Sequence, residues 1–284
     1  MASLTGNQRD LGTLQGPLLL FGGPYGNLEA TRAMRRTAEA RGIPPRRVIC
    51  NGDLTAYCAS PVETVALIRE WDIQLVMGNC EASLASDSDD CGCGFEQGSV
   101  CALNASKWFD YTNRRIGRSE REWMKQLPGA LRFSLGQLTF LVVHGAPSRI
   151  NRFVFPSTPR EQKRAELDLA ETEVVIGGHC GIPFGEQIDR RFWLNTGVIG
   201  LPANDGTPDG WYLLLETEGE QVRASWHRLS YDHRRASRRM GEAGLDTGYS
   251  QALINGRWPS LDILPPPEQR QQGIPLNPAK LWLA

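Results

Sequence analysis

The sequence predicts an α/β fold whose functional site lies where the strands of a sheet end. In the first third of the chain, short apolar segments alternate with segments of helical character. A glycine and a polar residue come directly after several of these apolar segments. Strands that alternate with helices form a mostly parallel sheet covered by helices. The polar groups that follow such strands gather at the carboxyl edge of the sheet, which is where ligands bind.

The first half of the chain contains the clearest alternation of strands and helices. The predicted strands are 17–21, 47–50 and 74–77, and the predicted helices are 27–40, 61–70 and 119–126. Pro61 is expected in a first helical turn, where its missing N–H is tolerated, and Gly42 is expected to end the preceding helix. Ser119 and Glu122 have the spacing of a capping box, which predicts the start of the third helix.

The second half of the chain predicts more antiparallel pairing. The expected elements are a hairpin of 131–135 with 138–143, strands at 173–176 and 191–194, a pair formed by 211–216 and 222–229, and a helix from 231 to 243. The expected organisation is an N-terminal extension (1–16), one domain (17–245) and a C-terminal tail (246–284). Beyond Pro265 the tail is rich in Pro and Gln, which predicts poor order.

Charge and cysteine content limit the classes of function. The 31 basic and 32 acidic side chains nearly cancel, so no field favours nucleic acid or an anionic membrane. The arginine pairs 234–235 and 238–239 are expected to form a solvated helix face. The N-terminal segment lacks the pattern of a secretory signal, so we expect a cytoplasmic protein. Its seven cysteines are therefore expected as buried thiols, metal ligands or redox groups rather than disulfides.

The segment 83–113 is expected to be an inserted loop with a function. It contains an acidic run followed by Cys91 and Cys93, with glycines on both sides of Cys93, and then Cys101. Such a composition is a poor core segment, and long loops inside compact domains are often functional.

Four polar residues follow four apolar segments and have the chemistry of metal ligands. They are Asp53, Asn79, His144 and His179, each beside a glycine that lets the backbone turn closely around an ion. Carboxylate, amide and imidazole groups together suit Mn, Fe, Zn or Ni. The ordered set therefore predicts a metal site at the edge of the sheet.

The motifs that contain these residues resemble those of the calcineurin-like metallophosphoesterases. The motifs are Gly52-Asp53, Gly78-Asn79-Cys80-Glu81, His144-Gly145, Gly178-His179 and Asn195-Thr196-Gly197. The similarity covers about residues 17–245 and is greatest to a small bacterial branch with Gly-Asn-Cys in the third motif. It implies a four-layer α/β/β/α sandwich of the metallophosphoesterase type. It also implies that Asp53 bridges two ions and that Asn79, His144 and His179 complete the shell of one of them.

The sequence differs from the family at the residues that bind only the other ion. Gly23, Tyr25 and Gly181 stand where that family has an Asp and two His residues. One or two ions of Mn, Fe or Zn are therefore expected. Three interpretations remain open: a second site rebuilt from other residues, a mononuclear enzyme, or a catalytically inactive binding or scaffold protein. A rebuilt site could also make an iron- or zinc-thiolate enzyme of different chemistry.

Further residues are assigned to the site as expectations. Tyr25 and Cys80 are predicted to face the reacting centre as catalytic groups. Additional candidate ligands are Cys58, Cys91, Cys93 and Cys180. Asn195 is expected to accept a hydrogen bond from a ligating histidine, and Arg152 to contact a substrate phosphate. The expected partner is a small-molecule phosphoester or a phosphoprotein.

Overall fold

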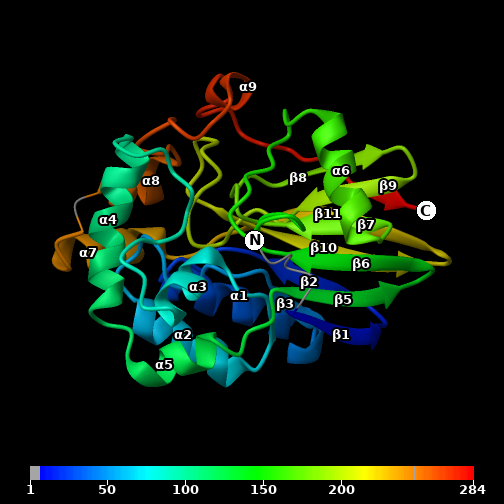
Figure 1. The fold of residues 1–284 in the computed structure, drawn as a ribbon, viewed down its shortest axis with the longest axis horizontal. Helices are drawn as coiled ribbons and strands as arrows, with labels where there is room; N and C mark the ends of the chain where they lie inside the picture. The colour runs from blue at the N-terminus through cyan, green and yellow to red at the C-terminus, as the bar shows by residue number, and fades with distance from the viewer. Residues whose placement is uncertain (1–6, 246) are drawn as a thin grey trace.

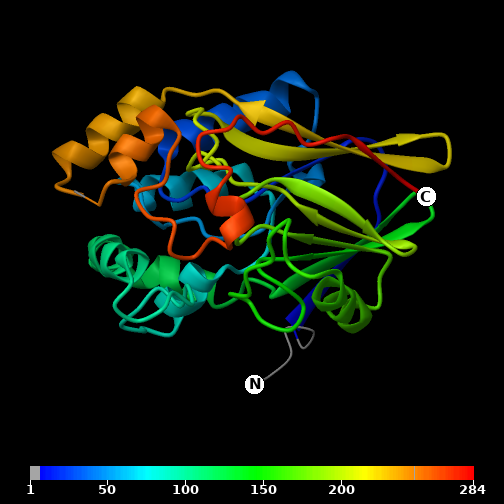
Figure 2. The ribbon, with the colours of Figure 1, turned by 90° about the horizontal axis from the view of Figure 1, so that it is seen from above.

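The computed structural model describes residues 7–245 and 247–284 (Figure 1). Residues 1–6 of the predicted N-terminal extension lie outside the described residues, as does residue 246, where the predicted tail begins. Seen from above, two sheets lie face to face with helices outside them (Figure 2). In the part of the chain that the structure describes, no helix is both long and apolar enough to cross a membrane.

Two six-stranded mixed sheets form the centre of the molecule. One has the order β1-β5-β6-β7-β9-β8, formed by Gln8–Thr13, Ala130–Leu135, Leu138–Val143, Val174–Gly177, Arg191–Asn195 and Phe184–Ile188. The other has the order β12-β11-β10-β2-β3-β4, formed by Leu281–Leu283, Gln221–Leu229, Gly210–Glu218, Leu18–Phe21, Val48–Cys50 and Gln74–Leu75. The predicted hairpin and the predicted late antiparallel pair are confirmed as β5–β6 and β10–β11.

The sequence of β2 shows why the sheets are buried on both faces. Leu18 and Leu20 belong to the core between the two sheets, and Leu19 and Phe21 belong to a second core under the helices. Because successive side chains of a strand point to opposite faces, an apolar residue at every position requires cover on both sides.

Helices supply that cover and complete four layers. On the β2 side they are α1 (Leu28–Ala40), α2 (Pro61–Trp71), α3 (Asn79–Ala85), α4 (Val100–Asn113), α5 (Arg118–Met124), α7 (His233–Glu242) and α8 (Tyr249–Asn255). On the β6–β7 side, α6 (Arg160–Ala170) buries Leu167 against Leu141 and Val175. The predicted α/β/β/α sandwich is therefore confirmed.

The segment 83–113 is more helical than predicted. Its second half is α4, which begins after Ser99, whose side chain accepts a hydrogen bond from the Ala102 N–H. Only the stretch between α3 and α4 is a loop. The predicted capping box at Ser119 is wrong, because α5 begins at Arg118 after Gly117.

Both terminal segments contribute to the sheets. The predicted extension contains β1, which pairs in parallel with β5. The tail contains α9 (Pro266–Gln269) and then β12, which pairs with β11. Leu283 is fully buried in the core between the sheets. The predicted poor order of the tail is therefore wrong, because its last residues carry an apolar strand that the composition of the preceding segment concealed.

Two arginines of α7 do not form the purely solvated face that was predicted. The Nε atoms of Arg235 and Arg239 lie 3.3 and 3.1 Å from Oε1 of Glu29, a buried residue of α1. A buried carboxylate needs such cationic partners. These contacts attach α7 to α1, next to the first loop of the site.

Candidate metal centre

The structure brings the four predicted ligands together from segments that follow four different strands. Nε2 of His144 lies 2.9 Å from Oδ1 of Asn79, 2.9 Å from Nδ1 of His179 and 3.3 Å from Oδ2 of Asp53. The donor atoms of Asp53, His144 and His179 all lie within 4.8 Å of one another. All four residues are buried. They follow β3, β4, β6 and β7, so the carboxyl ends of strands from both sheets meet at this point.

Each histidine uses one ring nitrogen for the protein and leaves the other for the site. Nδ1 of His144 lies 2.7 Å from the carbonyl oxygen of Asn51, and Nε2 of His179 lies 3.2 Å from the carbonyl oxygen of Cys93. A carbonyl only accepts, so these nitrogens carry the hydrogens. In the neutral rings, the lone pairs of His144 Nε2 and His179 Nδ1 therefore face each other.

The amide of Asn79 is oriented in the same way. Its Nδ2 donates a 2.8 Å hydrogen bond to the carbonyl of Cys91, which turns Oδ1 toward His144. Four electron-rich atoms thus converge: Asp53 Oδ2, Asn79 Oδ1, His144 Nε2 and His179 Nδ1. Two nitrogens and two oxygens, each oriented by an outer hydrogen bond or a neighbouring backbone, are the donor set that Mn, Fe or Zn accepts in proteins. The residues present therefore fit a metal ion.

The ionisation states of Asp53 and His179 suit the same purpose. Burial raises the pKa of Asp53, but the positive charge and hydrogen bond of a protonated His144, helped by the Cys80 N–H, outweigh burial and the pKa falls to about 2. Burial, together with His144, lowers the pKa of His179 to about 3. Burial lowers the pKa of His144, and the opposing Asp53 carboxylate raises it above its ordinary value. At neutral pH Asp53 is therefore ionised and His179 neutral, as metal ligands must be.

Glu81 organises the loops around the site and was missed as a site residue. Its carboxylate accepts hydrogen bonds from the N–H groups of Asp53 at 2.7 Å, Leu54 at 2.8 Å and Gly78 at 3.0 Å. A Cβ atom on Gly78 would lie 2.4 Å from Asp53 Oδ1, so only glycine permits this approach. Burial and the Asp53 charge raise the pKa of Glu81 to about 7. The one available signal was its place inside the Gly78–Glu81 motif.

Tyr25 fills the space beside Gly23. A Cβ atom on Gly23 would lie 2.5 Å from Cζ of the Tyr25 ring, so the ring occupies the position of any larger side chain there. Tyr25 is itself buried, and it lines a pocket together with Asp53 and His179. Gly181 lines the same pocket, and a Cβ atom there would reach Trp258 at 3.5 Å.

Three residues at the site have backbones in the left-handed conformation. The φ angles of Tyr25, Asp53 and Tyr57 are 53°, 58° and 55°. Such angles are uncommon in residues other than glycine, and they concentrate where a functional site imposes the backbone path.

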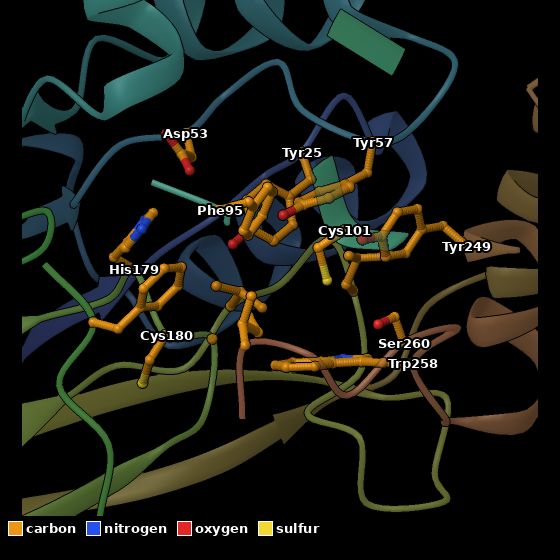
Figure 3. A pocket seen from close by; sticks show the side chains of 15 residues that line it. Tyr25, Asp53, Tyr57, Phe95, Cys101, His179, Cys180, Tyr249, Trp258 and Ser260 are labelled. Atoms are coloured by element: carbon orange, nitrogen blue, oxygen red, sulfur yellow. The ribbon is translucent and has the colours of Figure 1, made fainter. Parts of the chain in front are cut away.

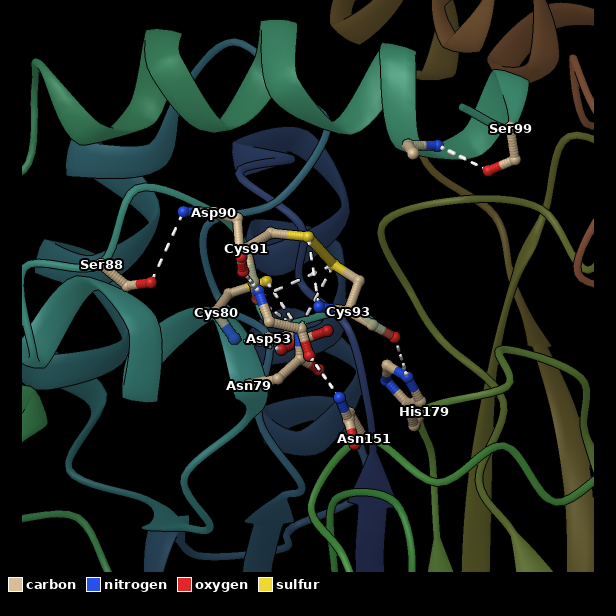
Figure 4. Close-up of a disulfide and its surroundings, with 12 residues drawn as sticks. Asp53, Asn79, Cys80, Ser88, Asp90, Cys91, Cys93, Ser99, Asn151 and His179 are labelled. Carbon is tan, nitrogen blue, oxygen red and sulfur yellow. Dashed lines mark hydrogen bonds between the residues drawn. A yellow bond between two sulfur atoms is a disulfide. The ribbon is translucent and has the colours of Figure 1, made fainter. Parts of the chain in front are cut away.

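The loop between α3 and α4 covers one side of the ligands and contains a disulfide (Figure 4). Cys91 and Cys93 are bonded to each other, with Cα atoms 5.3 Å apart across Gly92. The expectation that the cysteines form no disulfide is therefore wrong for this pair. Gly92 has a φ of 64°, a left-handed conformation that brings its two neighbours together. Asn151 Nδ2 donates a 2.7 Å hydrogen bond to the Gly92 carbonyl and ties the loop to the segment after His144.

The free cysteines are buried and contact protein groups. The sulfur of Cys58 lies 3.8 Å from the carbonyl of Gly200, and that of Cys180 lies 3.8 Å from the carbonyl of Ile182. Burial raises the pKa of Cys180 to about 12. Cys80 Sγ lies 3.6 Å from Asn79 Nδ2, and burial and then Asp53 raise the pKa of its thiol. Among the described residues, the metal-ligand group contains Asp53 and the two histidines and no cysteine.

Asn195 has partners other than the one expected, whereas the expected contact of Arg152 with a substrate phosphate stays a prediction. Asn195 Oδ1 accepts a hydrogen bond from the Gly197 N–H, and its Nδ2 lies 3.3 Å from Cys180 Sγ. The acceptors of the two imidazole N–H groups are backbone carbonyls instead. Arg152 forms a 3.1 Å ion pair with Glu166, a buried residue of α6.

Removing the disulfide should weaken metal binding and leave its stoichiometry unchanged. In a Cys91→Ser, Cys93→Ser variant the carbonyls that orient Asn79 and His179 remain, but the turn that presents them is no longer cross-linked. Loss of support around metal ligands weakens affinity by about 10- to 100-fold. We expect a Kd about tenfold higher by calorimetric titration, with the same number of ions at saturation. Cys101→Ser, which leaves the disulfide intact, is the control; a lower ion count in the double variant would instead make these cysteines ligands.

The fold and site together define the class of protein. Two stacked mixed sheets that present Asp, Asn and two His at their loop ends are the arrangement of a metallophosphoesterase. The domain model of the calcineurin-like phosphoesterase superfamily matches residues 26–220. The chain belongs to this superfamily.

Individual relatives are distant. An uncharacterized protein of Methanocaldococcus jannaschii is 23% identical over 251 residues, which cover 82% of this chain and 95% of that protein. The crystal structure of a metallophosphoesterase from Sphaerobacter thermophilus has a TM-score of 0.66 at 22% identity, covering 86% of this chain and 100% of that one. A hypothetical protein from Pyrococcus horikoshii has a TM-score of 0.70 at 18% identity, covering 84% and 98%. At these identities the structural likeness shows the fold alone.

Proposed function

We propose that the protein is a metal-dependent phosphoesterase-like hydrolase that works with one ion, held by Asp53, Asn79, His144 and His179. The observation that carries the proposal is the convergence of four acceptor atoms whose other polar atoms are already engaged. The other three acceptor atoms each lie within 3.3 Å of His144 Nε2. Buried acceptors that face one another are unfavourable unless a cation lies among them.

A single ion is favoured because the neighbouring site lacks ligands of its own. The three altered positions are Gly23, Tyr25 and Gly181, and they offer one phenol between them. Burial and then Asp53 raise the pKa of Tyr25, so its phenolate is unfavourable. The sulfurs of Cys58 and Cys180 face backbone carbonyls. A rebuilt second site and the thiolate enzyme therefore gain no support from these positions.

The bound ion would supply Lewis-acid polarisation of a phosphoryl oxygen and a lowered pKa for an attacking water. The chain's own residues hold and orient the reacting groups. Asp53 provides the negative charge that retains the cation. Tyr25, which stays protonated, can donate a hydrogen bond to a phosphoryl oxygen from the pocket side. Cys80 stays a thiol beside Asn79, so its role is to support that ligand rather than to attack phosphorus.

Hydrolysis of simple chromogenic phosphoesters tests the proposal. Protein freed of metal with a chelator should be inactive on 4-nitrophenyl phosphate and bis(4-nitrophenyl) phosphate. Addition of Mn²⁺, Fe²⁺ or Zn²⁺ should restore release of 4-nitrophenol from one or both. Release that is equal with and without metal, or absent with every ion although the ion binds, would contradict the proposed activity.

A further inference from the structure

An aromatic pocket opens directly from the metal centre (Figure 3). Asp53 and His179 line one end of it, and Trp258 and Tyr249 lie away from that end. Most of the remaining lining side chains are apolar or aromatic, including Phe95 and Phe153. A concave apolar site with a few polar groups at one end is the usual form of a small-molecule site.

The walls are built from ring faces and edges in mutual contact. The ring centroids of Phe153 and His179 are 4.2 Å apart, so one wall packs on a metal ligand. Tyr57 contacts Tyr25 edge-on at 4.7 Å and Tyr249 at 4.6 Å. Aromatic side chains packed in this way hold one another in place and present flat surfaces, which favour a flat apolar guest.

The charge of the pocket excludes a highly anionic guest. Of the described residues that line it, none is Lys or Arg. The formal negative charge among the lining residues comes from Asp53, which sits at the metal end. A chain of phosphates would have no cationic partner here, and burial of an unpaired charge is strongly unfavourable. One phosphoryl group at the ion, followed by a neutral group in the pocket, agrees with this lining.

The free volume limits the size of that neutral group. It is about 40 Å³, enough for roughly three water-sized groups in contact. This volume sets an upper limit on the guest, because it leaves no space for a second ring.

We propose that this pocket binds the alcohol part of the substrate, and that this part is a single, uncharged aromatic ring. The inference rests on the proposed hydrolase function. Water oxygen forms a bond to phosphorus, the bond from phosphorus to the ring's oxygen breaks, and that oxygen leaves as the phenol after taking up a proton from the water. Substrate selection then depends on the tail of the chain, because Tyr249, Trp258 and Ile263 lie beyond the residues 26–220 that the superfamily model matches.

The first test compares substrates that differ only in the alcohol. With the metal-loaded protein, phenyl phosphate should have a kcat/KM at least tenfold higher than ethyl phosphate, beyond the ratio that the same pair shows in metal-catalysed hydrolysis without protein. Trp258→Ala should reduce that preference by about tenfold, because one wall of the ring site is lost. Trp282→Ala is the matched control, since Trp282 is an exposed residue of β12 outside the pocket. Tyr249→Ala is a second variant if Trp258→Ala does not fold.

The second test needs no hydrolysis. Equilibrium dialysis of phenol, which is uncharged at neutral pH, against the chelator-treated full chain should show binding that weakens about tenfold in Trp258→Ala and is unchanged in Trp282→Ala. Binding without any hydrolysis would support the pocket and remove the proposed enzyme. If phenyl and ethyl phosphate are hydrolysed with equal kcat/KM after correction for the protein-free ratio, and phenol does not bind, the pocket inference is overturned and the enzyme remains.

Discussion

Replacing Asp53 by Asn should abolish stoichiometric metal binding and reduce hydrolysis by at least about a hundredfold. Asp53 is the one carboxylate in the metal-ligand group of the described residues. Its pKa of about 2 keeps it ionised at every working pH, so the substitution removes a full negative charge from a buried site. Loss of an outer hydrogen-bond partner already weakens metal sites by about 10- to 100-fold, and loss of a charged ligand should do more. Elemental analysis and the rate on 4-nitrophenyl phosphate measure both effects.

Asp189→Asn is the matched control for this substitution. Asp189 also has a φ of 58°, so the backbone demand on the asparagine is the same in both variants. Its side chain is exposed and pairs with Arg164, far from the ligands in the turn between β8 and β9. Metal content and rate should equal those of the wild type. Full metal content in Asp53→Asn would show that the ligands are assigned wrongly.

Replacing Glu81 by Ala should cause the largest loss of stability among single substitutions at the site. Three backbone N–H groups would lose their acceptor, and each unsatisfied buried donor costs about 1–3 kcal/mol. The three losses total about 3–9 kcal/mol, which at about 2–4 °C per kcal/mol corresponds to a fall in Tm of at least about 6 °C. Metal affinity should also fall, because the Asp53 backbone is one of the three donors.

The control is Glu161→Ala. Glu161 occupies the first turn of α6 as Glu81 occupies the first turn of α3, but its side chain is exposed. Its removal should change Tm by no more than about 2 °C. A similar Tm for Glu81→Ala and Glu161→Ala in thermal unfolding would mean that the carboxylate does not hold the three loops.

The ligand set could be predicted because each member follows a strand. Asp53, Asn79, His144 and His179 come after apolar segments beside a glycine, and the carboxyl ends of strands meet at one edge. Local pattern therefore carried the information about which residues converge. The same local alternation predicted nine of the twelve strands and four of the nine α-helices of the described residues, each to within a few residues, and missed α4, α6 and α8.

The hydrogen-bonding environment of the ligands could not be predicted, because backbone groups supply it. The carbonyls of Asn51 and Cys93 orient the two imidazoles, and a carbonyl carries no residue-specific signal. Asn195 was predicted for this role because sequence motifs identify side chains and not backbone groups. Glu81 was overlooked because its three hydrogen-bond partners are backbone N–H groups, which the sequence does not mark.

The aromatic pocket also could not be predicted from the sequence, because the residues of its walls come from distant parts of the chain. Tyr57 contacts Tyr249 at a ring distance of 4.6 Å, although the two are separated by most of the domain. The tail is polar and rich in proline, and its aromatic residues do not recur at the spacing of a helix or a strand. Their packing depends on tertiary contacts that no local pattern encodes.

Metal stoichiometry tests the one-ion site most directly. Metal-free protein is titrated with Mn²⁺ or Zn²⁺ while heat and hydrolytic rate are recorded in parallel, and elemental analysis of the dialysed end product gives the ion count per chain. A single ion per chain, with the rate rising to its maximum at one equivalent, is the predicted result. Two tightly bound ions, or a rate that continues to rise to two equivalents, would contradict it and show that a second site is built from residues such as Tyr25.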